Sequence, residues 1–149
     1  MNPERSGAER HRGREAALQL LYQWEVGRFE EGEFDDAVDL FWTVHPAPAA
    51  RCAFATGLVK GTTAHLAVID PLIEHNTANW RLTRLAVIDR LIMRLAVYEF
   101  LHADTPPVVV INEALELAKT FSGEQAVAFV NGVLDGVRRE LENESEREM

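Results

Sequence analysis

Apolar residues recur at helical spacing along most of the chain. Between residues 13 and 26 an apolar residue falls at every third or fourth position, and Gly27 follows as a helix stop. Residues 34–42 place apolar side chains on one face and aspartates on the other, as in a short amphipathic helix. Two prolines within residues 45–50 then break the chain, because proline is not tolerated inside a helix. This part of the chain therefore predicts two helices.

The middle of the chain predicts two longer helices. Residues 49–75 form one helical region, in which Pro71 should introduce a kink or a restart. Residues 81–102 are apolar most of the way round the helix, and Asp89 and Arg90 are among the few interruptions. A helix of this kind is flanked by other elements on several sides, so we expect it to be central.

The last two predicted helices occupy residues 107–121 and 122–141. Pro107 suits the first helical position, and an apolar stripe follows it. Residues 108–111 are also compatible with a strand, but no second strand-like segment exists to pair with it. Ser122 and Gln125 have the spacing of a capping box, which predicts that the last helix begins at Ser122. The chain is therefore predicted to be all-α.

Phe129 lies to one side of the inner face of the last helix, and Gly132 and Gly136 follow on the same flank. Each glycine costs a helix about 1 kcal/mol relative to alanine. We therefore expect something to approach this flank closely. The approaching group is either an RNA base or a packed helix, and both alternatives remain open from the sequence.

Composition indicates a globular chain of about one domain. Hydrophobic residues make up 47% of the 149 positions and charged residues 26%. We expect a basic, flexible arm over residues 1–12, a single helical domain over 13–142 and a charged tail over 143–149. No signal peptide or apolar run of about 20 residues is present, so we expect a cytoplasmic protein.

The acidic balance restricts the partners. A net charge of −9 opposes sequence-independent binding to nucleic acid, because such binding depends on cations that neutralise phosphates. The same charge favours recruitment of a basic protein. An RNA site must therefore be a small basic region of an otherwise acidic chain, and the arginines at positions 10, 12 and 14 are the first candidate for it. The alternative is that they belong to a solvated terminus without function.

Catalytic and metal-binding motifs are missing from the sequence. The five histidines never fall at the i, i+4 spacing of a helical zinc pair, and no glycine-rich phosphate loop or nucleophile elbow occurs. Cys52 is the single cysteine, which leaves no internal disulfide and no zinc site of the chain's own. We therefore predict that the protein is not an enzyme and that it has no cofactor and no metal.

Four segments together resemble the NusB family of bacterial antitermination factors. They are RGREAALQLLYQWEV (12–26), DRLIMRLAVYEF (89–100), INEALELAKTF (111–121) and FVNGVLDGV (129–137). The resemblance extends from about Arg10 to Val137 and implies two packed helical bundles of about six to seven helices. It also implies binding of the boxA element in nascent ribosomal RNA together with NusE, a basic ribosomal protein. The complex would help RNA polymerase to pass terminators.

The resemblance implies candidate RNA-binding residues at matching positions. The arm of the family corresponds here to residues 10–14, its LY to Leu21 and Tyr22, its AKSF to residues 119–121 and its FVNG to residues 129–132. The implied RNA-binding residues are Arg10, Arg12, Arg14, Tyr22, Lys119, Phe121 and Phe129. The three aromatic residues are alternatively part of the core. Residues 122–128 lack the basic residue that some relatives carry, so we expect the RNA affinity to depend more strongly on the arginines of the arm.

The resemblance also implies a protein interface on the central helix. Asp89, Arg90 and Met93 combine polar and apolar side chains in one stripe, which suits an interface with NusE. A structural salt bridge is the alternative for the two charged residues. Two further functions remain open, namely the RNA-binding domain of a ribosomal RNA methyltransferase system and a helical adaptor that binds protein only. The sequence also leaves a homodimer open.

Overall fold

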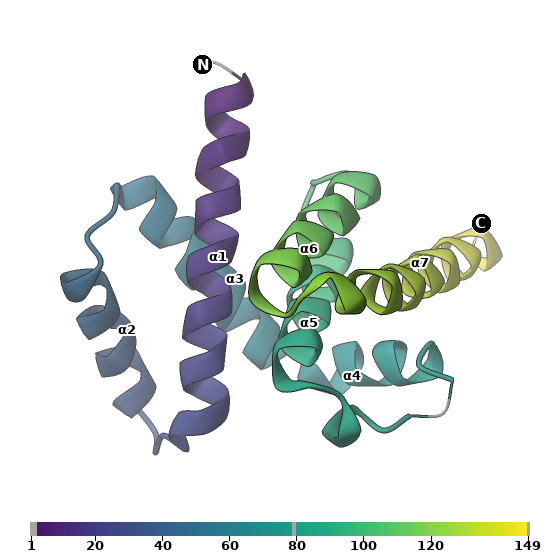
Figure 1. Ribbon diagram of the computed structural model, residues 1–149, viewed down its shortest axis with the longest axis horizontal. Coiled ribbons are helices and arrows are strands. Elements are labelled where there is room, and N and C mark those ends of the chain that lie inside the picture. Colours follow the sequence, from purple (N-terminus) through teal and green to yellow (C-terminus); the bar gives the residue numbers. More distant parts are fainter. Residues whose placement is uncertain (1–2, 79, 149) are drawn as a thin grey trace. The chain divides into compact units, whose positions relative to one another are not determined.

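The described part of the chain is helical and contains no strand. The computed structural model describes residues 3–78 and 80–148, with side chains from Gly7 onward (Figure 1). Seven α-helices and one 3-10 turn occupy these residues, which confirms the predicted all-α class and helix number. The contacts within the chain divide it into two compact units, residues 1–61 and residues 62–149. The strand alternative for residues 108–111 is wrong, because these residues are helical.

The first unit is built from α1 (Pro3–Gly27), α2 (Glu33–Val44) and most of α3 (Ala49–Ala64). α1 ends at Gly27, as predicted, and packs against α2. Gly32 precedes α2 with a φ of 86°, a left-handed conformation that glycine adopts without strain. The buried apolar residues of these three helices are Ala17, Leu18, Leu20, Leu21, Val38, Phe41, Ala55, Leu58 and Val59.

α1 begins ten residues before the predicted start. The segment before Gly13 has no apolar period, but the helix runs unbroken from Pro3. Polar residues extend it through pairs one turn apart, such as Glu9 with Arg12 and His11 with Glu15. The prediction that the helix begins at Gly13 is therefore wrong. Residues 1–2 of the predicted arm lie outside the described residues.

The predicted long helix over residues 49–75 is divided at His65 and not at Pro71. α3 ends at Ala64, α4 (Leu66–His75) follows, and Pro71 lies inside α4. The segment from Gly61 to Thr63 precedes the break, and its glycine and two threonines have low helix propensity. Within the described residues no helix alone has the length and apolar content needed to cross a membrane. Only α3 and α4 taken together, across their bend, reach that threshold.

The second unit contains α4, the 3-10 turn η1 (Leu82–Arg84), α5 (Val87–His102), α6 (Pro107–Phe121) and α7 (Glu124–Arg147). α5 packs against the other three helices, and nine of its residues are buried, which confirms that it is the central helix. It begins at Val87 and not at residue 81, because the backbone is extended at Leu85. Pro107 opens α6 as predicted.

The start and the end of α7 differ from the prediction. The capping box is wrong: Ser122 is the C-cap of α6, and its N–H donates to the carbonyl of Ala118. Gly123, with a φ of 132°, makes the turn and is the N-cap of α7 without a side-chain cap. At the other end α7 continues past Leu141 to Arg147, because the glutamates and the arginine of this segment are good helix formers and Arg138 pairs with Glu142 one turn later.

Candidate nucleic-acid interface

Arg10 and Arg14 lie on one side of α1 and stack on Phe54 of α3. Their guanidinium carbons are 5.7 Å and 5.5 Å from the centre of the phenyl ring, within the range of cation–π attraction. Gly13 lies beneath the same ring, since a Cβ added at this position would be 2.6 Å from Cδ2 of Phe54. The glycine therefore makes room for the ring that holds the two arginines.

Arg14 does not fit the phosphate contact predicted for it. Its exposed fraction is only 2%, because α1 is helical here and the guanidinium is turned onto Phe54. Arg10 is exposed, with one face of its guanidinium on the ring. Arg10 is therefore accessible to a ligand, whereas the Arg14 guanidinium is buried against the ring that both residues share.

Arg12 projects away from this cluster and belongs to an ion-pair network. Its Nη1 lies 3.3 Å from Oε1 of Glu9, and its side chain is exposed. Glu9 also accepts hydrogen bonds from Nε and Nη2 of Arg51 of α3, at 2.8–3.1 Å. These bonds hold the pKa of the Glu9 carboxyl below its usual value. The three predicted arginines therefore do not share a face, and Arg51 is a basic neighbour that the sequence pattern did not indicate.

The predicted aromatic contacts are on the surface. Tyr22 on α1 is 44% exposed, and Phe121 at the end of α6 and Phe129 on α7 are each 37% exposed. The core alternative is therefore wrong for all three side chains. Lys119, which is also exposed, lies on the last turn of α6, so Lys119, Phe121 and Phe129 flank the turn between α6 and α7 in the second unit. The arginines and Tyr22 belong to the first unit.

The two glycines on the flank of α7 have different surroundings. A Cβ added at Gly136 would clash with the side-chain amide of Asn76, whose Cγ would be 2.9 Å away. The Asn76 Nδ2 donates to the carbonyl of Leu72 at 2.9 Å, which fixes its position at the end of α4. Nothing lies within 4 Å of a Cβ added at Gly132. The expected close approach is therefore helix packing at Gly136, and the flank is open at Gly132.

The predicted protein-partner residues do not lie on the surface. Asp89, Arg90 and Met93 are all buried, and Met93 is completely so. Asp89 lies in the first turn of α5, where the helix dipole favours a negative charge. Arg90 donates through Nη1 to the carbonyl of Leu82 at 3.0 Å. The stripe that suggested an interface is thus internal, because α4, α6 and α7 all pack against α5.

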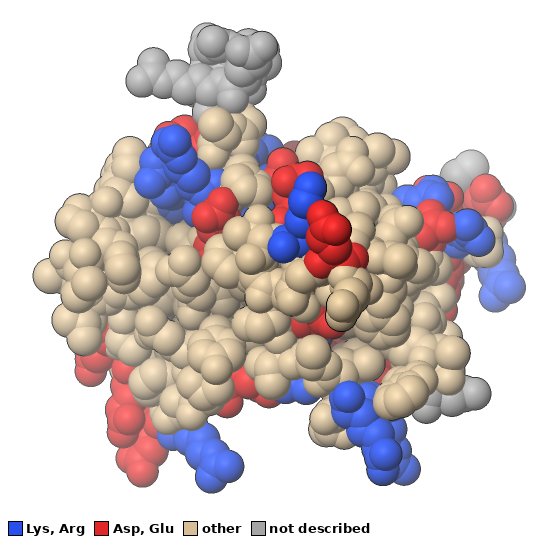
Figure 2. Space-filling model, viewed as in Figure 1, with Lys and Arg blue, Asp and Glu red and all other residues tan. Residues whose placement is uncertain are grey.

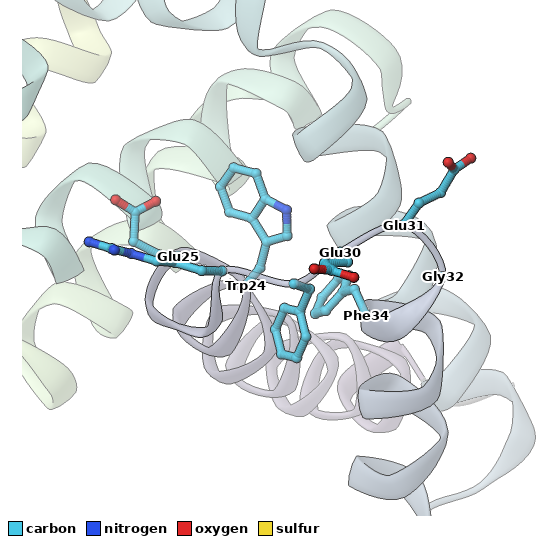
Figure 3. Close-up of a pocket in the computed structure, with 8 residues that line it drawn as sticks. Trp24, Glu25, Glu30, Glu31, Gly32 and Phe34 are labelled. Atoms are coloured by element: carbon cyan, nitrogen blue, oxygen red, sulfur yellow. The ribbon is translucent and has the colours of Figure 1, made fainter.

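An open hollow of about 460 Å³ lies between the end of α1 and the start of α2. Figure 3 shows the Trp24 ring standing out from α1, the Phe34 ring beside the hollow and Glu31 pointing away from the other lining residues. Three glutamates and one arginine line it, so its rim is acidic. An acidic rim beside half-buried aromatic rings suits a basic protein better than RNA.

No side-chain group suited to a metal ion is found among the described residues. No cluster of three or more His, Cys, Asp or Glu side chains occurs in residues 3–78 and 80–148 with suitable placement. Cys52 is half-buried, and its Sγ lies 3.6 Å from the carbonyl of Ala47. The chemistry that the described surface offers is therefore charge and stacking.

Comparisons with known proteins agree with one another. Residues 11–139 match the model of the NusB family. The transcription antitermination protein NusB of Anaeromyxobacter sp. (strain Fw109-5) is 48% identical over 140 residues, which cover 93% of this chain and 96% of the relative. A structure of T. maritima NusB is 34% identical with a TM-score of 0.76, covering 88% of this chain and 91% of that one. A crystal structure of antitermination factors NusB and NusE in complex with dsRNA contains a chain that is 29% identical to this one, with a TM-score of 0.75. The match covers 89% of this chain and 98% of that one.

Proposed function

The chain belongs to the NusB family of transcription antitermination factors, and we propose that it binds the boxA element of nascent ribosomal RNA together with the ribosomal protein NusE. In this role it acts by binding and not by catalysis. The resulting complex joins RNA polymerase and helps it to pass terminators. The observation that carries the proposal is the likeness over about nine-tenths of the chain to a protein crystallised with NusE and dsRNA.

The RNA site uses charge from the first unit. Arg10 and Arg12 contact phosphates, because their guanidinium groups are exposed on α1. Arg14 and Phe54 hold Arg10 in place and do not touch the RNA themselves. Charge-assisted hydrogen bonds of this kind fix the path of the strand without selecting its sequence.

Exposed rings on each of the two units supply a second kind of RNA contact. Tyr22, Phe121 and Phe129 stack on unpaired bases, since each ring is more than a third exposed. Lys119 follows the phosphates beside Phe121 and Phe129. Stacking rings with nearby cations are typical of proteins that bind single strands.

NusE binds through charge complementarity. The chain carries a net charge of −9, which attracts a basic partner and speeds its encounter. Because Asp89, Arg90 and Met93 are buried, NusE contacts other residues. The acidic hollow between α1 and α2 is one surface of suitable charge.

An anisotropy titration tests the proposed function. Labelled boxA-type RNA and a scrambled RNA are titrated with the full chain at two salt concentrations, with and without NusE. We expect a preference for boxA that grows when NusE is present. The variant Arg10→Gln/Arg12→Gln should bind less tightly, and its plot of log K against log salt should be flatter by up to about 1.4, from two lost phosphate contacts at about 0.7 each.

A matched control removes the same charge elsewhere. Arg139→Gln/Arg147→Gln alters two arginines near the end of α7 and should leave both affinity and salt slope unchanged. If the full chain binds NusE but no RNA, the protein is an adaptor and the RNA role is refuted. If it binds neither, the whole proposal fails.

A further inference from the structure

Trp80, Arg81 and Arg84 form an exposed patch in the connection between α4 and α5. Trp80 is 57% exposed, and both arginines are exposed as well. Together with Ala78 they line an open hollow of about 510 Å³. Basic side chains project as a group from the region of Figure 2 that corresponds to η1 in Figure 1. Neither the predicted RNA-binding residues nor the predicted protein interface includes this patch.

The backbone of the patch is held firmly from inside. The hydroxyl of Thr77, which is buried, donates to the carbonyl of Trp80 at 2.7 Å. The carboxylate of Glu74 accepts a hydrogen bond from the backbone N–H of Leu82 at 3.3 Å. The buried Arg90 donates to the carbonyl of Leu82 from the other side of the turn. Thr77 and Arg90 are buried, whereas Glu74 is exposed, and together their hydrogen bonds fix the backbone that presents the side chains of the patch.

The 3-10 geometry of η1 separates the charged side chains from the core. Arg81 is the N-cap of this turn, and its carbonyl accepts a hydrogen bond from the N–H of Arg84, while Leu82 between the two arginines is buried. Both arginines line the same hollow as Trp80. Ala78 adopts a φ of 52°, a left-handed conformation that is uncommon for a residue with a side chain.

Among the residues whose side chains are described, no ion pair and no side-chain hydrogen bond is found for Arg81 or Arg84. Several other basic residues are paired with acids, namely Arg51 with Glu9, Arg94 with Asp70, Arg138 with Asp135 and Lys60 with Asp35. In a chain with a net charge of −9, two neighbouring cations beside an exposed ring indicate an anionic, aromatic ligand.

We propose that Trp80 and the arginines 81 and 84 form a second contact site for single-stranded RNA, with a base stacked on the indole and phosphates on the arginines. The inference rests on the proposed RNA binding and extends it to a surface outside the family-derived residues. A basic protein such as NusE is disfavoured here, because two cations without acidic partners would repel it. Stacking without hydrogen-bond readout makes the site tolerant of base identity.

The test compares variants of the full chain by anisotropy with labelled single-stranded RNA. Trp80→Ala should lower affinity by on the order of tenfold, as expected for loss of one base–aromatic stack, and Trp80→Phe should recover most of it. Arg81→Gln/Arg84→Gln should flatten the salt dependence by up to about 1.4. The exposed control Val108→Ala and the charge control Arg139→Gln/Arg147→Gln should change neither quantity. Circular dichroism checks that each variant folds.

The possible outcomes separate this inference from the proposed function. In one outcome, wild type binds RNA, the Arg10→Gln/Arg12→Gln variant binds it more weakly, and Trp80→Ala leaves the affinity unchanged. That outcome overturns the RNA contact at the patch, while the RNA-binding function of the chain stands. If Trp80→Ala or the double arginine variant impairs NusE binding and leaves RNA affinity intact, the patch is a protein surface and the inference is also overturned. If wild type binds no RNA, both the inference and the proposed function fail.

Discussion

Replacing Gly13 by alanine tests the packing that supports the arginine cluster. Two effects oppose each other at this position. Alanine favours the helix by up to about 1 kcal/mol relative to glycine. Its Cβ, however, would lie 2.6 Å from Cδ2 of Phe54, about 1 Å short of an ordinary contact of 3.4–4 Å. Overpacking of this degree costs about 1–3 kcal/mol, so we expect a net loss of stability.

Three further variants make the sign of the effect decisive. Gly57→Ala, in α3 of the same unit, has nothing within 4 Å of the added Cβ and should stabilise by up to about 1 kcal/mol. Phe54→Ala should be destabilising by itself, because it removes a half-buried ring and two cation–π contacts. When Phe54 is already alanine, Gly13→Ala should become stabilising, because only the helix propensity term remains.

Urea denaturation followed by circular dichroism gives the four free energies of this double-mutant cycle. Hydrogen exchange of the α1 amides reports whether the change is local to the first unit. The packing argument requires that Gly13→Ala changes sign between the two backgrounds. A stabilising effect in wild type, or equal effects in both backgrounds, would refute the close contact between α1 and the Phe54 ring.

Four other substitutions test further contacts. Gly136→Ala should destabilise the fold by about 1–3 kcal/mol, because the added Cβ clashes with an asparagine amide. Gly132→Ala should instead stabilise the fold by up to about 1 kcal/mol, because nothing lies near the added Cβ. Thermal melts of the two variants measure both effects. Asp70→Asn breaks a charged, paired hydrogen bond from Arg94 and should cost about 1–3 kcal/mol in urea denaturation; no change would mean that the pair is unimportant. The pKa of Glu9 is lowered in the folded chain, so its stabilisation is present above its ordinary pKa of 4.5 and lost as the pH falls through the lowered value. The stability advantage of wild type over Glu9→Gln should therefore shrink on acidification, and a gap that widens in acid would contradict the assignment.

The sequence alone predicted the helical class and the faces of several helices. The stripe of α6 is an example, since Val110, Ile111, Ala114, Leu117 and Ala118 are buried as their spacing indicates, whereas Phe121 at the end of the same predicted stripe is exposed. The end of α1 at Gly27 and the start of α6 at Pro107 were also predictable. These features depend on periodicity and on the backbone chemistry of glycine and proline, which act within a few residues.

Candidate functional residues were predicted less well, because exposure depends on what packs against each helix. Arg14 resembles its neighbour Arg10 in sequence, yet its guanidinium is buried on Phe54, forty residues away along the chain. Arg90 reads as an interface residue but holds the carbonyl of Leu82 beneath the η1 turn. Both differences arise from one cause: an arginine with a long apolar stem is equally compatible with the surface and with the interior.

The sequence by itself determined that this chain is helical, where most of its helices lie, and which family it resembles. Only the tertiary structure decided that Gly13 accommodates a ring, that Asp89, Arg90 and Met93 are internal, and that Trp80, Arg81 and Arg84 line the same hollow. The physical reason is the distance along the sequence over which each effect acts. Local periodicity records which side of a helix is apolar, whereas burial, ion pairing and the surface that remains for a ligand depend on residues distant in sequence.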